Sequence, residues 1–175
     1  MTNKTAWVLG ILAAATLAAA ATPPDATKAR TALRAGPVTL AEIDGDRIVP
    51  LRGETALAGF LERGLNGSGD PRVHGTIATA SIERDGDRYF LVGRGRSDDN
   101  HCLTPTLELT AGTESFETAA AAGGIRFMWI ETCYGANCPA CLATKDEAGH
   151  ILFCTCMPAG DCERIVIPVP IIIFI

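Results

Sequence analysis

The residues of this chain that could do chemistry are mainly its cysteines. The chain has 175 residues and seven cysteines, and six of the seven fall within the thirty residues 133–162. The six are Cys133, Cys138, Cys141, Cys154, Cys156 and Cys162. Cys102 stands apart from them. A cluster of this kind predicts one of three kinds of chemistry: disulfide bonding, metal binding or thiol–disulfide exchange.

Disulfide bonding is the interpretation that we favour. Cysteines two residues apart on a strand point to the same face with parallel Cβ vectors, so we expect Cys154 and Cys156 to pair with other cysteines. Segment 134–149 carries few large apolar side chains, and we expect a loop that disulfides hold in place, each contributing about 2–4 kcal/mol. The sequence does not select the pairing. The odd count leaves Cys102 as the expected unpaired thiol, or else Cys102 bonds into the cluster and frees a different cysteine.

A metal site is the first alternative. The spacing Cys133-x4-Cys138-x2-Cys141, with Cys154 thirteen residues further on, resembles the loop of plant-type [2Fe–2S] ferredoxin domains. The short final gap is closer to that of the iron–sulfur subunits of molybdenum hydroxylases. The resemblance covers 22 residues and implies that these four cysteines are the ligands. Zinc bound by the C-x2-C and C-x-C thiolates is a simpler form of the same hypothesis. Because Cys156 and Cys162 have no place in the ferredoxin pattern, we expect no bound cofactor.

Thiol–disulfide exchange is the second alternative. The sequence Cys138-Pro139-Ala140-Cys141 resembles the C-x-x-C active site of thioredoxin-like oxidoreductases, in which the first thiol lies at the start of a helix. Only 34 residues follow Cys141, fewer than that fold places after its motif. His101 lies beside Cys102, but a nucleophile and its base need hydrogen-bond geometry rather than adjacency in sequence. The sequence contains neither G-x-S-x-G nor H-E-x-x-H, and we expect a non-catalytic protein.

The N-terminal residues predict the compartment in which the cysteines react. Lys4 precedes an uncharged stretch, Ala6 to Ala21, that ends in small residues, and this order is typical of a secretory signal peptide. We therefore expect a secreted or periplasmic protein with no stable membrane span after signal cleavage, in surroundings where thiols form disulfides. The expected organisation is a signal peptide (1–21), a flexible leader (22–36) and a single exported domain (37–175) with a disulfide-clamped segment (133–162).

The rest of the chain predicts the fold that must position the cysteines. Asp-Gly pairs at 44–45 and 85–86 lie between apolar runs, which is the pattern of a tight β-hairpin. We expect strands at 37–43, 47–52, 73–83, 88–95, 125–130 and 150–156. Apolar residues at helical spacing predict a helix over 53–63, with Gly64 as its stop signal, and Glu114–Ala122 is a second helix candidate. The predicted fold class is mainly antiparallel β with one or two short helices and a cysteine-rich C-terminal loop region.

The net charge and the C-terminal residues limit the kinds of partner that we expect. A net charge of -5 argues against nucleic-acid binding. The apolar C-terminal run contains Pro168 and Pro170, whose missing N–H groups lie on one edge, so we expect an edge strand there. A loop held rigid by cross-links loses little entropy on binding. We therefore expect a non-catalytic binding or envelope-associated module, with an unidentified protein or envelope partner.

Overall fold

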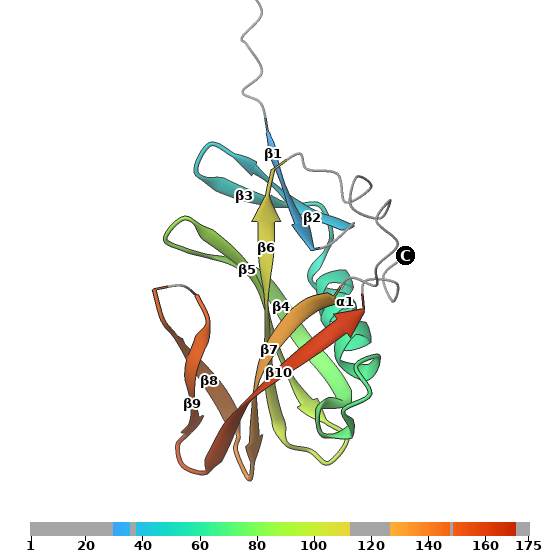
Figure 1. Ribbon diagram of the computed structural model, residues 1–175, viewed down its shortest axis with the longest axis vertical. Coiled ribbons are helices and arrows are strands. Elements are labelled where there is room, and N and C mark those ends of the chain that lie inside the picture. Colours follow the sequence, from blue (N-terminus) through green and yellow to red (C-terminus); the bar gives the residue numbers. More distant parts are fainter. Residues whose placement is uncertain (1–29, 36–37, 113–126, 148, 171–175) are drawn as a thin grey trace, which may run out of the picture.

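The computed structural model describes residues 30–35, 38–112, 127–147 and 149–170 (Figure 1). The predicted signal peptide and the second helix candidate lie outside these residues. All seven cysteines lie within them. The elements are β1 (Thr31–Ala35), β2 (Val38–Asp44), β3 (Arg47–Pro50), α1 (Glu54–Asn66), the short 3-10 helix η1 (Pro71–Val73), β4 (Gly75–Asp85), β5 (Arg88–Ser97), β6 (Cys102–Ala111), β7 (Phe127–Ala136), β8 (Ala140–Lys145), β9 (Ile151–Met157) and β10 (Asp161–Pro170).

Eight of these strands form one sheet, and β8 and β9 form a separate hairpin. The order along the sheet is β10-β7-β6-β1-β2-β3, and β5 pairs with both β6 and β4. Every strand pair is antiparallel. The predicted fold class, mainly antiparallel β with a short helix, is therefore confirmed. In the cysteine-rich segment, the strand expected over 150–156 is present as β9, whereas 134–149, which we expected to be a loop, contains the end of β7 and all of β8.

The two Asp-Gly pairs form the tight turns that they predict. Asp44 pairs with Arg47 at the β2–β3 turn, and Asp85 pairs with Arg88 at the β4–β5 turn. The glycine of each turn has a positive φ, about 60° in both cases, which glycine adopts at little steric cost. These turns fix the register of four of the strands that build the sheet.

Helix α1 packs on one face of the sheet and forms the main hydrophobic core with it. Its buried residues Leu57, Phe60, Leu61 and Leu65 recur at helical spacing on one face. Leu91, Leu103 and Ile130 meet them from β5, β6 and β7. The helix runs to Asn66 and buries Gly64, so Gly64 is not the predicted stop. Here the packing of Leu65 on the core outweighs the helix-breaking tendency of one glycine.

Two ends of the described chain are tied into the sheet. Thr31–Ala35 falls within the segment predicted as a flexible leader, but it forms β1, which pairs with β2 and with the end of β6. The physical reason is burial, because Leu33 and Ala35 are both buried in the core. At the other end, β10 is an edge strand that pairs only with β7 along the sheet path, which is the position that its two prolines predict.

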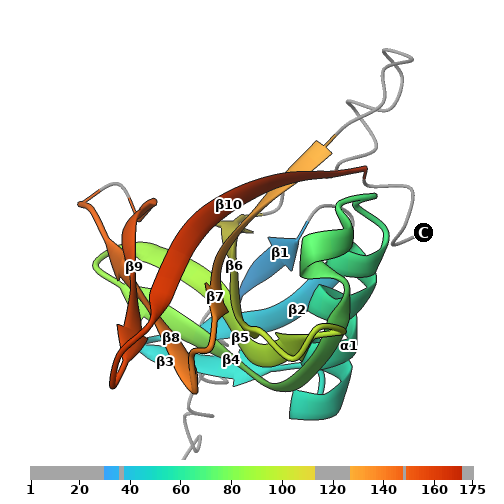
Figure 2. The ribbon, with the colours of Figure 1, turned by 90° about the horizontal axis from the view of Figure 1, so that it is seen from below.

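The hairpin β8–β9 and helix α1 lie on opposite sides of the sheet. Figures 1 and 2 show the hairpin on one side and the helix on the other, with β5, β6 and β7 between them. We call the sheet face that carries α1 the inner face and the opposite one the outer face. Among the described residues, no helix has the length and apolarity needed to cross a lipid bilayer.

Candidate functional site

Strand alternation places the cysteines of the sheet on its outer face. Cys102 of β6 and Cys162 of β10 both pair with Gly135 of β7, so these three residues form one row across three strands. The next row on the same face contains Thr104, Cys133 and Arg164. Since successive side chains of a strand point to opposite faces, Cys102 and Cys133 face the hairpin, while Leu103 of the core faces α1.

Three disulfides involve the hairpin segment. Cys102 bonds to Cys141, Cys133 to Cys154 and Cys138 to Cys156. The first two join the hairpin to β6 and β7, and the third joins the start of the hairpin to its second strand. The Thr104 hydroxyl also donates a hydrogen bond of 2.8 Å to the Cys141 carbonyl. Cys154 and Cys156 each pair elsewhere, as expected from their spacing.

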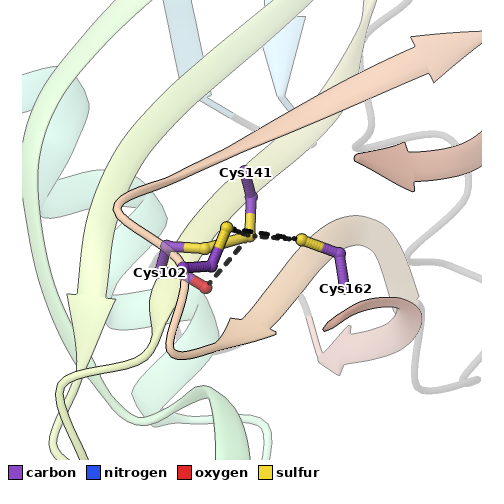
Figure 3. Close-up of side chains that lie close together, drawn as sticks. Cys102, Cys141 and Cys162 are labelled. Atoms are coloured by element: carbon purple, nitrogen blue, oxygen red, sulfur yellow. Dashed lines mark hydrogen bonds between the residues drawn. A yellow bond between two sulfur atoms is a disulfide. The ribbon is translucent and has the colours of Figure 1, made fainter. Parts of the chain in front are cut away.

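Four sulfur atoms lie together at the base of the hairpin. The Sγ atoms of Cys102, Cys138, Cys141 and Cys162 are all within 4.8 Å of one another, and we call them the sulfur cluster. Figure 3 shows the Cys102 and Cys162 side chains on opposite sides of the Cys141 sulfur. The Sγ of Cys162 lies 3.2 Å from that of Cys141 and 3.6 Å from that of Cys138.

Gly135 makes room for the sulfur cluster. A Cβ atom at this position would lie 2.7–2.8 Å from the Sγ atoms of Cys141, Cys102 and Cys162. Any larger residue would therefore collide with three sulfurs at once. Gly135 has no evident role in the sequence alone, because its importance arises only when β6, β7 and β10 lie side by side.

Cys162 is the cysteine without a disulfide bond. From the sequence we expected Cys162 among the bonded six and Cys102 as the odd thiol, but in the structure Cys102 is bonded and Cys162 is not. The observed pairing is the alternative that the sequence left open, in which Cys102 bonds into the cluster and frees another cysteine. Burial, with a smaller contribution from the Asp161 carboxylate, raises the pKa of the Cys162 thiol above its ordinary value.

The ferredoxin-like ligand set is not brought together. Cys133 and Cys154 form their own disulfide, and the sulfur cluster contains Cys102 and Cys162 in their place. The C-x-x-C pair behaves differently from a thioredoxin-like motif as well. Cys138, the first thiol of the motif, lies in the connection between β7 and β8 rather than at the start of a helix, and Cys138 and Cys141 are each bonded to a different cysteine.

Glu131 anchors the end of the hairpin nearest its turn. Its carboxylate accepts hydrogen bonds from Ile151 N–H at 2.7 Å, from His150 Nδ1 at 2.9 Å and from Arg164 at 3.1 Å. Burial raises the pKa of Glu131, but the bond from Ile151 and those from His150 and Arg164 outweigh it and lower the pKa below its ordinary value. A single carboxylate thus connects β7, β9 and β10.

The tip of the hairpin rests on Phe90 of β5. The Lys145 ammonium lies 3.8 Å from the centroid of the Phe90 ring, a cation–π geometry. Gly149, whose φ is +80°, lies against the same ring, and a Cβ there would be 2.3 Å from Phe90 Cζ. Only glycine satisfies both the backbone conformation and this close approach. The hairpin is therefore held at its base by sulfur, and at the end nearest its turn by a carboxylate and an aromatic ring.

A groove of about 640 Å³ lies beside the hairpin on the outer face. Trp129 and Val166 line it, and both are exposed, Trp129 by 59%. Two residues that line it, Arg34 and Thr106, each carry a buried polar atom, Nε and Oγ1, that finds no hydrogen-bond partner among the described residues. Thr106 is only 4% exposed. The groove therefore combines an exposed apolar surface with the charged side chains of Glu131 and Arg164.

The outward face of the hairpin is apolar. Of the seven large hydrophobic side chains that are exposed among the described residues, four lie on β8 and β9: Leu142, Leu152, Phe153 and Met157. Leu142, Phe153 and Met157 point away from the strand faces that carry the hairpin cysteines, because they alternate with Cys141, Cys154 and Cys156. Leu152 lies at the register shift beside Lys145 and is also exposed. Concentration of exposed apolar side chains on one rigid element indicates an interaction surface.

His101 is not paired with the sulfur of its neighbour Cys102. Its Nδ1 forms a short hydrogen bond with the Tyr134 hydroxyl, while Cys102 is bonded to Cys141. This geometry leaves the His101–Cys102 pair without the contact that a base and its nucleophile need. His101 and Cys138 both line a second, smaller pocket of about 310 Å³ next to the sulfur cluster.

Comparison with known proteins adds no family to these observations. The chain matches no protein-family model, and neither the curated proteins nor the solved structures contain a significant match. The function must therefore be argued from the site itself. Two residues that hold it, Glu131 and Gly149, were missed by sequence analysis, since a glutamate in a strand and a glycine in a turn are too common to be informative.

Proposed function

We propose that this protein is an exported, non-catalytic binding module that uses its outer face to bind a protein partner. One observation carries the proposal: a hairpin that disulfides fix to the sheet carries four of the seven exposed large hydrophobic side chains. A surface that is already rigid loses little conformational entropy on binding. Exposed apolar side chains are otherwise costly to a secreted protein, since they favour aggregation.

The groove extends this surface toward the sheet. Trp129 is a large amphipathic side chain of the kind that dominates the energy of protein interfaces. The proposed partner therefore presents an apolar segment to Trp129 and to the exposed hydrophobic side chains of the hairpin.

The test compares partners bound by matched variants of the mature protein. The double variant Leu152→Ser, Phe153→Ser removes apolar surface from the hairpin, and Leu51→Ser removes an equally exposed leucine elsewhere, 50% exposed. Each is immobilised and incubated with envelope and secreted proteins of the native host. We expect a protein that wild type and Leu51→Ser retain and that the hairpin variant loses by at least about tenfold. Equal retention by all three chains would refute the proposed surface.

Export is tested separately on the native chain. We propose cleavage after Ala21, which intact mass and N-terminal sequencing measure directly. Disulfides in the isolated protein support an oxidising compartment. A full-length chain recovered from the cytosol with all its thiols free, and still folded, would refute export and the role of the disulfides together.

A further inference from the structure

The sulfur cluster has more in common with a metal centre than with two separate disulfides. Ordinary structural disulfides occupy separate places in a fold, whereas here sulfurs from two disulfides and one thiol meet at a single point. We propose that Cys102, Cys138, Cys141 and Cys162, when reduced, form a tetrathiolate site for Zn²⁺. The site is distinct from the proposed binding surface, which lies on the outward face of the hairpin and in the groove.

The spacing of the sulfurs supports four ligands around one ion. Tetrahedral zinc with Zn–S bonds of about 2.3 Å places its sulfurs about 3.8 Å apart. The Cys138–Cys141, Cys138–Cys162 and Cys141–Cys162 sulfurs are separated by 3.9, 3.6 and 3.2 Å. Cys102 Sγ is within 4.8 Å of all of them. Loading therefore requires sub-ångström movements of most sulfurs and separation of the bonded pair Cys102–Cys141.

The backbone around the cluster is suited to a metal site. Cys138 and Cys141 have the C-x2-C spacing of zinc knuckles, and the other two ligands come from neighbouring strands on either side of Gly135. The absence of a side chain at Gly135 leaves the space that the sulfurs occupy. Three of the four cysteines are buried and Cys162 is half-buried, so the ion would be shielded from water.

An ion can reach the cluster, and a positive charge lies beside it. Cys138 lines the pocket of about 310 Å³, together with Arg96 and His101. The Arg96 guanidinium donates hydrogen bonds to the carbonyls of Asn100 and Pro139, which hold it next to the cluster. Four thiolates around Zn²⁺ carry a net charge of about −2, and a nearby arginine offsets part of that charge.

Binding of the ion requires that two disulfides are first reduced. One equivalent of a dithiol reductant gives two electrons and two protons to Cys102–Cys141 and becomes a disulfide, and a second equivalent does the same for Cys138–Cys156. The ion then binds Cys102, Cys138, Cys141 and Cys162 and displaces their thiol protons into solvent. Cys156 remains a thiol, and Cys133–Cys154 is not involved.

The first experiment identifies the ligands in the wild-type mature chain. The protein is reduced with a phosphine under anaerobic conditions, titrated with Co²⁺ as a spectroscopic substitute for Zn²⁺, and then alkylated. We expect one tetrahedral, thiolate-bound Co²⁺ per chain and protection of Cys102, Cys138, Cys141 and Cys162 from alkylation. A lack of protection overturns the proposal, and so does protection of the ferredoxin-like set, which includes Cys133 and Cys154.

The second experiment uses a matched pair of variants. Cys162→Ser removes a proposed ligand but no disulfide, so its oxidised form should fold like wild type, which circular dichroism verifies. Cys156→Ser removes no ligand and frees Cys138, so it should load Co²⁺ after reduction of Cys102–Cys141 alone. We expect Cys162→Ser to bind Co²⁺ at least about tenfold more weakly than Cys156→Ser. Equal affinity in the two variants overturns the proposal.

Discussion

The two faces of the sheet are covered by different kinds of chemistry. On the inner face, helix α1 and the sheet bury 22 residues in one cluster, and none of them is a cysteine. On the outer face, five of the six buried residues of the hairpin cluster are cysteines, and the sixth is Ile151. The hairpin has too few apolar side chains facing the sheet to remain there by burial alone. Covalent bonds and a few polar contacts replace that burial and leave the apolar residues of the hairpin pointing outward.

The largest effect should come from the inner face. Leu61 of α1 is fully buried, and Leu61→Ala should lower the free energy of unfolding by about 2–5 kcal/mol, because it leaves a cavity in the main core. Chemical denaturation of the oxidised mature chain measures this loss. Leu152→Ala, at an exposed leucine of the hairpin, serves as the control and should change stability by less than about 0.5 kcal/mol. Equal losses of stability at Leu61 and Leu152 would show that the two faces do not differ in how strongly burial stabilises them.

Removing one disulfide should affect the outer face alone. The double variant Cys133→Ala, Cys154→Ala deletes a link between β7 and β9 and should cost about 2–4 kcal/mol. Amide hydrogen exchange should accelerate in β8 and β9, while α1 and β5 keep their protection. Cys162→Ala, which removes no disulfide, is the control. Uniform loss of protection across the sheet would show that the hairpin and the core unfold as one unit.

The Glu131 carboxylate should stabilise the hairpin in a pH-dependent way. Glu131→Gln weakens the hydrogen bonds to Ile151, His150 and Arg164 and should cost about 1–3 kcal/mol at neutral pH. Since the pKa of Glu131 is lowered in the folded protein from 4.5, its contribution is complete above that value and is lost as the pH falls through the folded pKa.

Thermal unfolding of both chains between pH 7 and pH 3 measures this contribution. The difference in stability between wild type and Glu131→Gln should be constant near neutral pH and should shrink in acid. A difference that stays constant down to pH 3 would mean that the charge of Glu131 does not hold the hairpin.

The smallest effect should come from the tip of the hairpin. Lys145→Met keeps most of the aliphatic contact with Phe90 and removes the charge over the ring, which should cost about 0.5–1 kcal/mol. Faster amide exchange near the β8–β9 turn is the measurement. Arg84→Met provides a comparison, because its guanidinium lies 5.8 Å from the centroid of Tyr89, and it should have less effect. A larger effect at Arg84 would mean that Lys145 does not secure the tip.

The features that the sequence predicted correctly are set by neighbouring residues. The Asp-Gly turns, the helix face containing Leu57 and Leu61, and the edge position of the proline-containing strand all follow from local spacing. The predictions that failed at the ends of elements failed because they relied on local patterns alone. Gly64 and the strand Thr31–Ala35 depend on burial against distant residues, which local patterns do not contain.

The candidate site depends on strand order and was only partly predictable. Cysteine density indicated disulfides, but the partner of each cysteine depends on which strands are neighbours. Cys102 and Cys162 are 60 positions apart in sequence, yet they flank Gly135 because β6 and β10 both pair with β7. Cys102, Thr104 and Thr106 alternate with apolar residues along β6, so the sequence places them on one face of that strand. Which face of the sheet this is, and that the hairpin covers it, becomes clear only once β7 is placed beside β6.

The register at the hairpin base has a consequence for how this architecture can vary. Ala136 and Asp161 are direct partners at the ends of β7 and β10, so the chain leaves the sheet and returns to it at a single point. Residues 137–160 are therefore a removable insert: a two-residue turn joining these partners would preserve the order of every remaining strand. The strand order of the helix-covered half of the molecule does not depend on this arm.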